Sequence, residues 1–249
     1  MQQAELFPSP RQLTLDLGGS DQAGLEDFSG EQNRLPRELV RALLRGDAEP
    51  VQLLVWGAPG CGRSHLLQAA CHEAGALGGA AAYLPLNELA DYGPGVLEGL
   101  ERLPLVAVDD VQAVAGCPAW EEGLFDLINR AREQGARLLL SADGPPTALG
   151  LSLPDLVSRL GWGPVLRLPD PDDALKAQVL LQRAEGRGLE LPEEVIRYLL
   201  TRHSRRLSDL LALFDRLDEA SLSCGRRLSL PFVRAVLEED VARVKPGGG

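Results

Sequence analysis

Short apolar runs alternate with amphipathic segments along the first two thirds of the chain. The apolar runs are nearly continuous, which is typical of strands that are buried on both faces of a parallel sheet. This alternation predicts an α/β fold in which helices cover both faces of the sheet. We expect strands at Val51–Trp56, Ala80–Leu84, Leu105–Val108, Arg137–Leu140 and Val165–Leu168, and helices at Leu35–Leu44, Ser64–Ala76, Gly95–Glu101 (poorly defined) and Ala119–Gln134.

The pattern changes after the last expected strand, where Pro169–Asp173 interrupts the chain and only helical spacing follows. This change predicts a small all-α domain at residues 169–241, after an α/β domain at residues 25–168. Residues 1–24 and 242–249 are expected to form a flexible arm and a flexible tail. The helices of the second domain are expected at Asp172–Arg187, Pro192–His203, Leu207–Ser221 and Leu230–Glu239.

A glycine-rich turn lies between the first expected strand and the helix that follows it. Its spacing is that of a phosphate-binding Walker A loop, in which backbone N–H groups and a helix N-terminus hold a phosphate; an ordinary strand–helix turn is the alternative. Arg63 stands where the motif has lysine, so a planar fork carries the charge. We expect it to contact the β-phosphate of ADP, and we expect binding to survive this exchange better than fast hydrolysis. The candidate nucleotide-binding residues here are Gly57, Pro59, Gly60, Cys61, Gly62, Arg63, Ser64 and His65.

Two carboxylates, Asp109 and Asp110, end the apolar strand that starts at Leu105. In P-loop NTPases the first such acid helps to hold Mg²⁺, and the second can polarise the attacking water. Ser64 and Asp109 are therefore candidate ligands of Mg²⁺, and Asp110 is a candidate catalytic residue. Taken alone, an aspartate that caps a helix would give the same pattern. Asp110 is also one methylene shorter than glutamate, so its carboxylate reaches less far towards a water.

Two further polar positions depend on their place in the fold. Ser141 and Asp143 follow the next apolar strand, at the sheet edge where ligands bind in open α/β folds, although a strand-end turn explains them equally well. Arg159 lies on a short helical segment with no obvious local acidic partner. It is either a solvated surface arginine or an arginine finger that is presented to a neighbouring subunit.

Composition narrows the class of partner. The net charge of −11 argues against a dedicated surface for nucleic acid or membrane, although local basic patches remain compatible with it. The chain has no apolar run of about 18 residues and no signal peptide at its start. Its four cysteines have no CxxC spacing and no metal-site pairing with histidine. We expect reduced thiols, a cytoplasmic protein and no membrane partner.

Taken in order, these motifs resemble the AAA+ family: Walker A, Walker B, a sensor strand, an arginine before the last strand, and a helical lid. Leu103–Gln112, Asp143–Pro146 and Leu153–Gly163 are similar to the AAA+ core of the bacterial replication initiator DnaA. We expect the initiator's C-terminal DNA-binding domain to be absent, since the helical lid reaches about residue 240. A core of this kind with arginine in its phosphate loop resembles the Hda family of DnaA regulatory inactivators. The resemblance covers roughly residues 25–240.

The resemblance implies a negative regulator of replication initiation that binds ADP or ATP, with Mg²⁺ possible. In this family an ADP-bound protein on the sliding clamp promotes ATP hydrolysis by DnaA, so DNA would be contacted only indirectly. Arg159 would be the finger that acts in trans, although self-association through it is also possible. Asp143 would be the first sensor, and residues 28–33 the adenine-side linker. One position departs from the family: Ser208 stands where the second-sensor arginine is expected, so Arg205 or Arg206 would have to reach the phosphates instead.

The N-terminal arm carries a segment that is similar to the clamp-binding peptide of the same family. An amide side chain can anchor such a peptide while leucines fill an apolar pocket, but an edge strand would show the same alternation. The candidate partner-binding residues are Gln12, Leu13, Leu15 and Leu17. Two other functions stay open: a self-sufficient AAA+ ATPase, such as a helicase loader or a clamp-loader-like protein that uses Asp110, and an adaptor that uses the fold as a scaffold.

Overall fold

The computed structural model describes residues 24–26, 28, 30–46, 50–202 and 206–244, without the side chains of 239–244. Contacts divide the chain into an α/β unit that ends at Leu168 and a helical unit that begins at Pro169, with residues 58–62 grouped with the helical unit.

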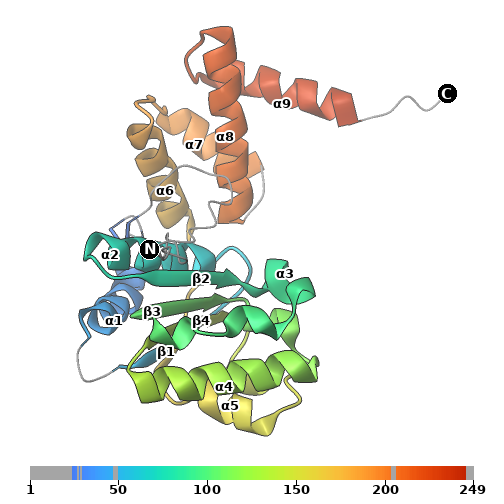
Figure 1. The fold of residues 1–249 in the computed structure, drawn as a ribbon. Coiled ribbons are helices and arrows are strands. Elements are labelled where there is room, and N and C mark those ends of the chain that lie inside the picture. Colours follow the sequence, from blue (N-terminus) through green and yellow to red (C-terminus); the bar gives the residue numbers. More distant parts are fainter. Residues whose placement is uncertain (1–23, 27, 29, 47–49, 203–205, 245–249) are drawn as a thin grey trace, which may run out of the picture. The chain divides into compact units, whose positions relative to one another are not determined.

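The α/β unit is built on a five-stranded sheet with the strand order β2-β3-β4-β1-β5. Every neighbouring pair of strands is parallel. This order places the carboxyl ends of β1, β3 and β4 next to one another, as the candidate site requires (Figure 1). The strands are β1 (Gln52–Trp56), β2 (Ala81–Pro85), β3 (Leu105–Asp109), β4 (Arg137–Ala142) and β5 (Val165–Arg167).

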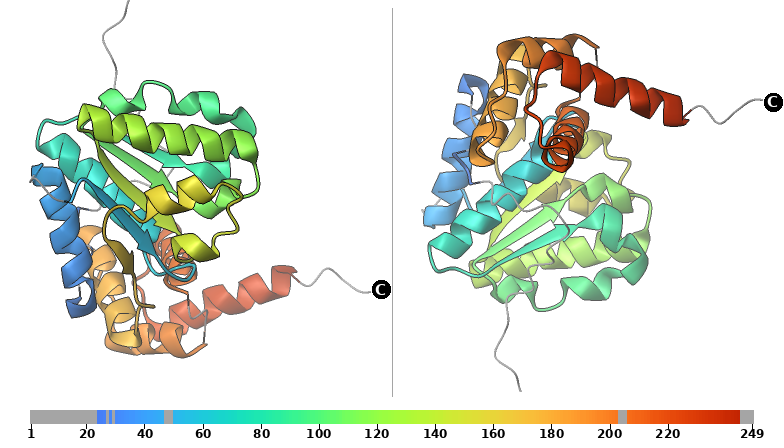
Figure 2. Two further views of the ribbon diagram at one scale, coloured as in Figure 1. Left: turned by 90° about the horizontal axis from the view of Figure 1, so that it is seen from below. Right: turned by 90° about the horizontal axis from the view of Figure 1, so that it is seen from above.

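Helices cover both faces of this sheet, which confirms the expected α/β class. Helices α1 and α2 lie on one face, and α4 and α5 lie on the other (Figures 1 and 2). The core beneath α4 and α5 combines aliphatic side chains of the strands with Trp120, Leu124, Leu127 and Ile128 of α4. The helices of this unit are α1 (Arg34–Arg45), α2 (Arg63–Ala76), α3 (Leu86–Leu89), α4 (Pro118–Gln134) and α5 (Pro154–Leu160).

The prediction of a poorly defined helix at Gly95–Glu101 is wrong. The structure has two short 3-10 segments there, Pro94–Leu97 and Leu100–Arg102, and Gly99 between them has φ 79°. Glycine reaches this left-handed region at low cost and weakens a helix interior, so the apolar spacing is not continued as an α-helix.

The helical unit contains four helices among the described residues after 168, and no strand. Their shared core is centred on Phe214, which is fully buried, and includes Leu180, Val195 and Leu210. The helices are α6 (Asp173–Gly186), α7 (Glu193–Arg202), α8 (Leu207–Cys224) and α9 (Leu230–Val244).

Ion pairs add to this core on the line where α6 meets α8. Arg183 binds both carboxylate oxygens of Asp215, at 2.9 and 3.0 Å. Arg187 reaches Asp215 at 3.0 Å and Asp218 at 2.9 Å. A fork-shaped guanidinium matches a carboxylate in this geometry, so the pairs fix the register of the two helices.

Candidate functional site

The glycine-rich loop has the backbone conformation that its sequence predicts. Gly60 and Gly62 lie in the left-handed region, at φ 88° and 96°, where other residues are strained. The N–H of Gly57 donates to the carbonyl of Ala142 at 3.3 Å, which ties the start of the loop to β4. Helix α2 begins directly after the loop, at Arg63, as in a phosphate-binding turn.

Arg63 is turned towards the end of β3. Its side chain is only 9% exposed, and its guanidinium donates to the carbonyl oxygen of Gly57 at 2.9 Å and to Oδ1 of Asp110 at 3.0 Å. Nε2 of Gln112 donates to the same carboxylate oxygen at 2.9 Å. Asp110 is therefore held by two donors. Both donors bond to Oδ1, so this oxygen is not available to accept a proton from an attacking water.

The backbone of Asp110 is also unusual. Its φ of 59° makes it the one described residue other than glycine with a positive φ. This conformation costs about 1–3 kcal/mol and persists only where the surroundings enforce it. Here the N–H of Asp110 donates to Oγ of Ser141 at 2.9 Å, and Oδ1 accepts from Arg63. The strained residue is thus fixed by both β4 and α2.

Asp109 is buried and accepts hydrogen bonds on both carboxylate oxygens. The hydroxyl of Tyr83 on β2 donates to Oδ2 at 2.6 Å, and the hydroxyl of Ser141 donates to Oδ1. The side chains of Ser64 and Gln68 lie near the Tyr83 hydroxyl. Burial and the adjacent carboxylate raise the pKa of Tyr83 far above its ordinary value, so it stays a neutral donor.

Ser64 and Asp109 are the residue types that hold Mg²⁺ in P-loop proteins, and Tyr83 joins them. These residues would hold a magnesium ion only if this hydroxyl gave up its hydrogen bond to Asp109. The described residues contain no cluster of three or more His, Cys, Asp or Glu side chains suited to a metal. An ion here would therefore take its other ligands from phosphate and water, as magnesium usually does.

Other expected site residues lie around this centre. The N–H of Asp143 donates to Oε1 of Gln112 at 3.0 Å, so Gln112 links Asp143 to Asp110. Phe28 is buried and stacks on His65 with ring centroids 6.2 Å apart, which places part of the expected linker beside the first turn of α2. The nucleotide-binding roles of these residues stay predictions.

Arg159 belongs to a different group of residues, on the face covered by α4 and α5. Its Nε donates to Oδ1 of Asn129 at 2.9 Å, and its guanidinium carbon lies 3.7 Å from the centre of the Trp162 ring and 5.3 Å from that of Phe125. It shares no hydrogen bond or ion pair with Arg63 or the two carboxylates of β3. The structure therefore does not bring Arg159 into the nucleotide site of its own chain.

Buried polar side chains hold both ends of α5. Glu121 of α4 is fully buried and accepts from the backbone N–H groups of Gly116, Ser152 and Leu153, at 2.7, 3.0 and 2.6 Å. At the other end, Nε2 of Gln52 donates to the carbonyl of Arg159 at 2.9 Å. These contacts anchor the backbone on both sides of α5, so α5 presents Arg159 from a fixed position.

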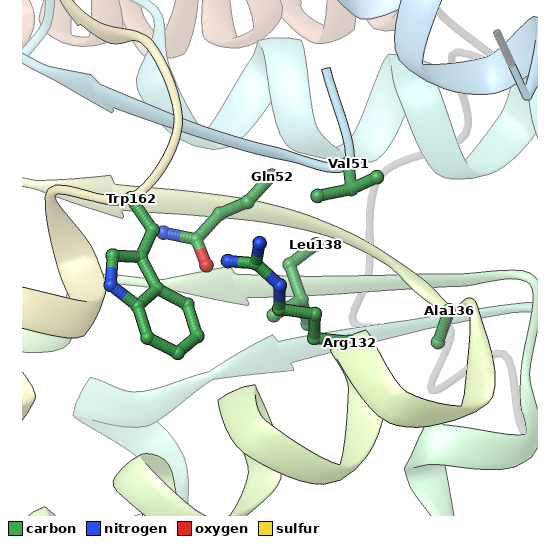
Figure 3. A pocket seen from close by; sticks show the side chains of 6 residues that line it. All are labelled: Val51, Gln52, Arg132, Ala136, Leu138 and Trp162. Carbon is green, nitrogen blue, oxygen red and sulfur yellow. The ribbon is translucent and has the colours of Figure 1, made fainter. Parts of the chain in front are cut away.

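Gln52 also lines a small cavity beside α5. Its other lining residues include Val51 and Leu138 of the sheet region, together with Arg132 and Trp162 (Figure 3). The guanidinium carbon of Arg132 lies 4.5 Å from the centre of the Trp162 ring, so Trp162 is in contact with two arginines.

Several predicted residues are not placed in either site. Arg205 lies outside the described residues, as do the arm residues Gln12, Leu13, Leu15 and Leu17. Arg206 immediately precedes α8, and the side chain of Ser208 in the first turn of α8 bonds to Asp209 at 3.4 Å. The replacement of the second sensor therefore stays a prediction.

None of the four cysteines, all of which lie in the described part of the chain, forms a disulfide. Burial raises the pKa of Cys71 to about 12. None of the described helices is both long enough and apolar enough to cross a membrane.

Sequence reasoning missed Tyr83, Glu121 and Asn129. Each acts on a residue at least 26 positions away in the chain. A lone tyrosine in a strand, or a polar residue in an amphipathic helix, carries no local signal of such a contact. Only the pairing of β2 with β3 and the packing of α5 on α4 reveal them.

Comparison with known proteins supports the reading of both units. Residues 173–237 match the family model described as Hda, lid domain. The chain is 27% identical to AMPPCP-bound DnaA from Aquifex aeolicus, with a TM-score of 0.66 over 79% of this chain and 65% of that one. It is also 27% identical to a DNA replication initiation factor, with a TM-score of 0.65 over 82% of this chain and 67% of that one.

Domain III of DnaA from Thermotoga maritima shows the same fold, with a TM-score of 0.75 at 23% identity over 87% of this chain and 96% of that domain. The chain thus spans about two thirds of the length of the longer proteins to which it is similar. The sheet order, the phosphate-loop conformation and the match to a lid domain all support an AAA+ fold. The α/β unit therefore has an AAA+ fold related to that of DnaA, and the helical unit after it matches a lid domain of the Hda type.

Proposed function

We propose that this protein is a nucleotide-bound negative regulator of replication initiation, which binds the sliding clamp and stimulates ATP hydrolysis by DnaA. The observation that carries the proposal is the pairing of Arg63 with Asp110. It occupies the acid that would otherwise activate water in the protein's own site. Meanwhile Arg159 is held on a fixed helix away from that site. Hydrolysis assisted by Arg159 would therefore take place on a partner.

Nucleotide binding has support from the phosphate-loop conformation and from the related DnaA of Aquifex aeolicus, whose structure contains AMPPCP. We propose that the protein is cytoplasmic and that its bound nucleotide is ADP. A loop that lacks lysine and has a paired second acid can retain a nucleotide without turning it over quickly.

The test of this function is a comparison of hydrolysis rates. We expect slow turnover by the protein alone, and a large increase when ATP-bound DnaA and clamp-loaded DNA are added. Fast turnover by the protein alone, unchanged by DnaA, would instead identify a self-sufficient ATPase. Failure of ADP to raise the melting temperature would identify an adaptor that uses the fold as a scaffold.

Clamp binding is assigned to the N-terminal arm on its sequence alone. We expect the double substitution Leu15→Ala and Leu17→Ala to abolish binding to the clamp, because the two leucines would fill its apolar pocket. Surface plasmon resonance on immobilised clamp measures the effect. Replacement of Thr14, which alternates with them, is the matched control and should leave the affinity within about 3-fold. Equal binding by the double variant would remove the arm from the proposal.

Tyr83 should make nucleotide binding insensitive to magnesium, because its hydroxyl occupies Asp109. We expect the ADP affinity of the wild-type protein to change by less than about 3-fold when Mg²⁺ is chelated. In Tyr83→Phe one charge-assisted hydrogen bond is lost, so Mg²⁺ should strengthen ADP binding by about 10-fold. Tyr92→Phe is the control, since Tyr92 is 76% exposed. The same magnesium dependence in Tyr83→Phe and in the wild-type protein would contradict this role.

A further inference from the structure

Arg132, Trp162 and Arg159 form one cluster on the surface of the α/β unit. The two guanidinium carbons lie 4.5 and 3.7 Å from the centre of the same indole ring. Trp162 is 40% exposed and Arg132 is exposed, whereas Arg159 is half-buried. Tryptophan and arginine are the residues that most often dominate the binding energy of protein interfaces. The cluster therefore has the residue types that are typical of the centre of a protein–protein interface.

Neither guanidinium has a carboxylate partner among the described residues, although the chain has 36 acidic and 25 basic side chains. Asp155 lies one turn before Arg159 on α5, at the spacing that favours an ion pair, yet Arg159 binds Asn129 instead. Arg130 on the same helix as Arg132 does pair, with Glu101 at 3.4 Å. The positive charge of the cluster is left for an external anion.

The hydrogen bond of Arg159 to Asn129 leaves the edge of the guanidinium with the two terminal nitrogens available for that anion. Asn129 accepts only from Nε, so the two terminal nitrogens still carry hydrogen-bond donors. Stacking on Trp162 fixes the plane of the guanidinium, which lowers the entropy lost on binding. Two such forks beside one ring match a compact anion with several charges better than an acidic peptide with its charges spread out.

We propose that Arg132 is a second phosphate-binding residue of this surface, which acts with Arg159 on the nucleotide of an AAA+ partner, and that Trp162 positions both arginines. The inference rests on the proposed function, in which that partner is ATP-bound DnaA. Arg159 stabilises the charge that develops on the transferred phosphoryl group. Arg132 adds a second donor to the same anion, and the indole keeps both arginines in place before the partner arrives.

The test compares three alanine variants in the reconstituted hydrolysis assay with ATP-bound DnaA and clamp-loaded DNA. We expect Arg132→Ala to lower the stimulated rate by about 10- to 100-fold, the loss of one hydrogen bond to a charged group. Arg130→Ala, which removes the same charge from the same helix, should keep the rate within about 3-fold of wild type. Arg159→Ala is measured in parallel as the reference for complete loss.

The outcomes separate this inference from the function on which it rests. Full stimulation by Arg132→Ala beside an inactive Arg159→Ala would overturn the role of Arg132 alone. No stimulation by the wild-type protein, or full stimulation by Arg159→Ala, would overturn the proposed function and this inference with it. Equal losses in Arg132→Ala and Arg130→Ala would show a general effect of charge, and would also overturn the specific role. Trp162→Phe should retain part of the stimulation, because phenylalanine offers a smaller face to the arginines.

Discussion

Replacement of Arg159 by alanine is expected to abolish the stimulation of ATP hydrolysis by DnaA, with a loss of about 10³- to 10⁵-fold in rate. A guanidinium that neutralises charge in the transition state of phosphoryl transfer has this effect in other nucleotide-hydrolysing proteins. Arg159 is suited to it because α5 is held at both ends by Glu121 and Gln52. The measurement is the release of phosphate from ATP-bound DnaA on clamp-loaded DNA.

Binding measurements on the same variant serve as its control. The affinities for ADP and for the clamp should remain within about 3-fold of wild type, since Arg159 contacts neither the phosphate loop nor the arm in this proposal. Arg159→Lys keeps the charge but loses the planar fork, so it should restore only a small part of the rate. Normal stimulation by Arg159→Ala would refute the trans mechanism.

Glu121→Ala is expected to cause a large loss of stability, about 3–5 kcal/mol in the free energy of unfolding, because buried N–H donors lose a charged acceptor. The substitution leaves three backbone N–H groups without their acceptor, in a position where the side chain is fully buried. Denaturant unfolding followed by circular dichroism measures the change. Glu122→Ala is the matched control, because Glu122 is the exposed neighbour on α4. It should change stability by less than about 0.5 kcal/mol. Equal effects of the two substitutions would contradict this role of Glu121.

The same carboxylate predicts how stability changes with pH. Burial alone would raise the pKa of Glu121, but the N–H groups of Ser152, Gly116 and Leu153 outweigh it and hold this pKa below the ordinary value of 4.5. The folded state therefore binds the proton less tightly than the unfolded state. The stabilisation is fully present above pH 4.5 and is lost as the pH falls through the folded pKa. The stability difference between wild type and Glu121→Ala should shrink below that pH.

The sequence was sufficient to predict the sheet, because each strand carries its own apolar run and the loop after β1 carries its own glycines. The bounds shift by only one or two residues in most elements; α4, for example, begins at Pro118 rather than Ala119. The helix expected at Gly95–Glu101 was wrong because the prediction relied on the apolar spacing, although the segment contains two glycines. Tertiary packing leaves that segment as 3-10 turns on α4.

The site was predicted less completely for a physical reason. Arg63, Asp109 and Asp110 are marked by motif spacing, but the partner that each residue selects depends on side chains brought together by folding. The Arg63–Asp110 pair spans 47 positions, and the contact between Arg159 and Asn129 spans 30. These pairings change the function that we infer for the motif residues. In the sequence, Arg63 is a replacement of the usual lysine of the phosphate loop. In the folded protein, it is the counter-ion of Asp110.

The most direct test of the central claim locates the phosphate that is released. ATP labelled on its γ-phosphate is loaded either onto DnaA or onto this protein, and the two are mixed on clamp-loaded DNA under single-turnover conditions. We expect rapid release of label from DnaA and slow release from this protein, because Asp110 is paired in its own site while Arg159 acts on the partner. Rapid release only when the label starts on this protein would contradict the account.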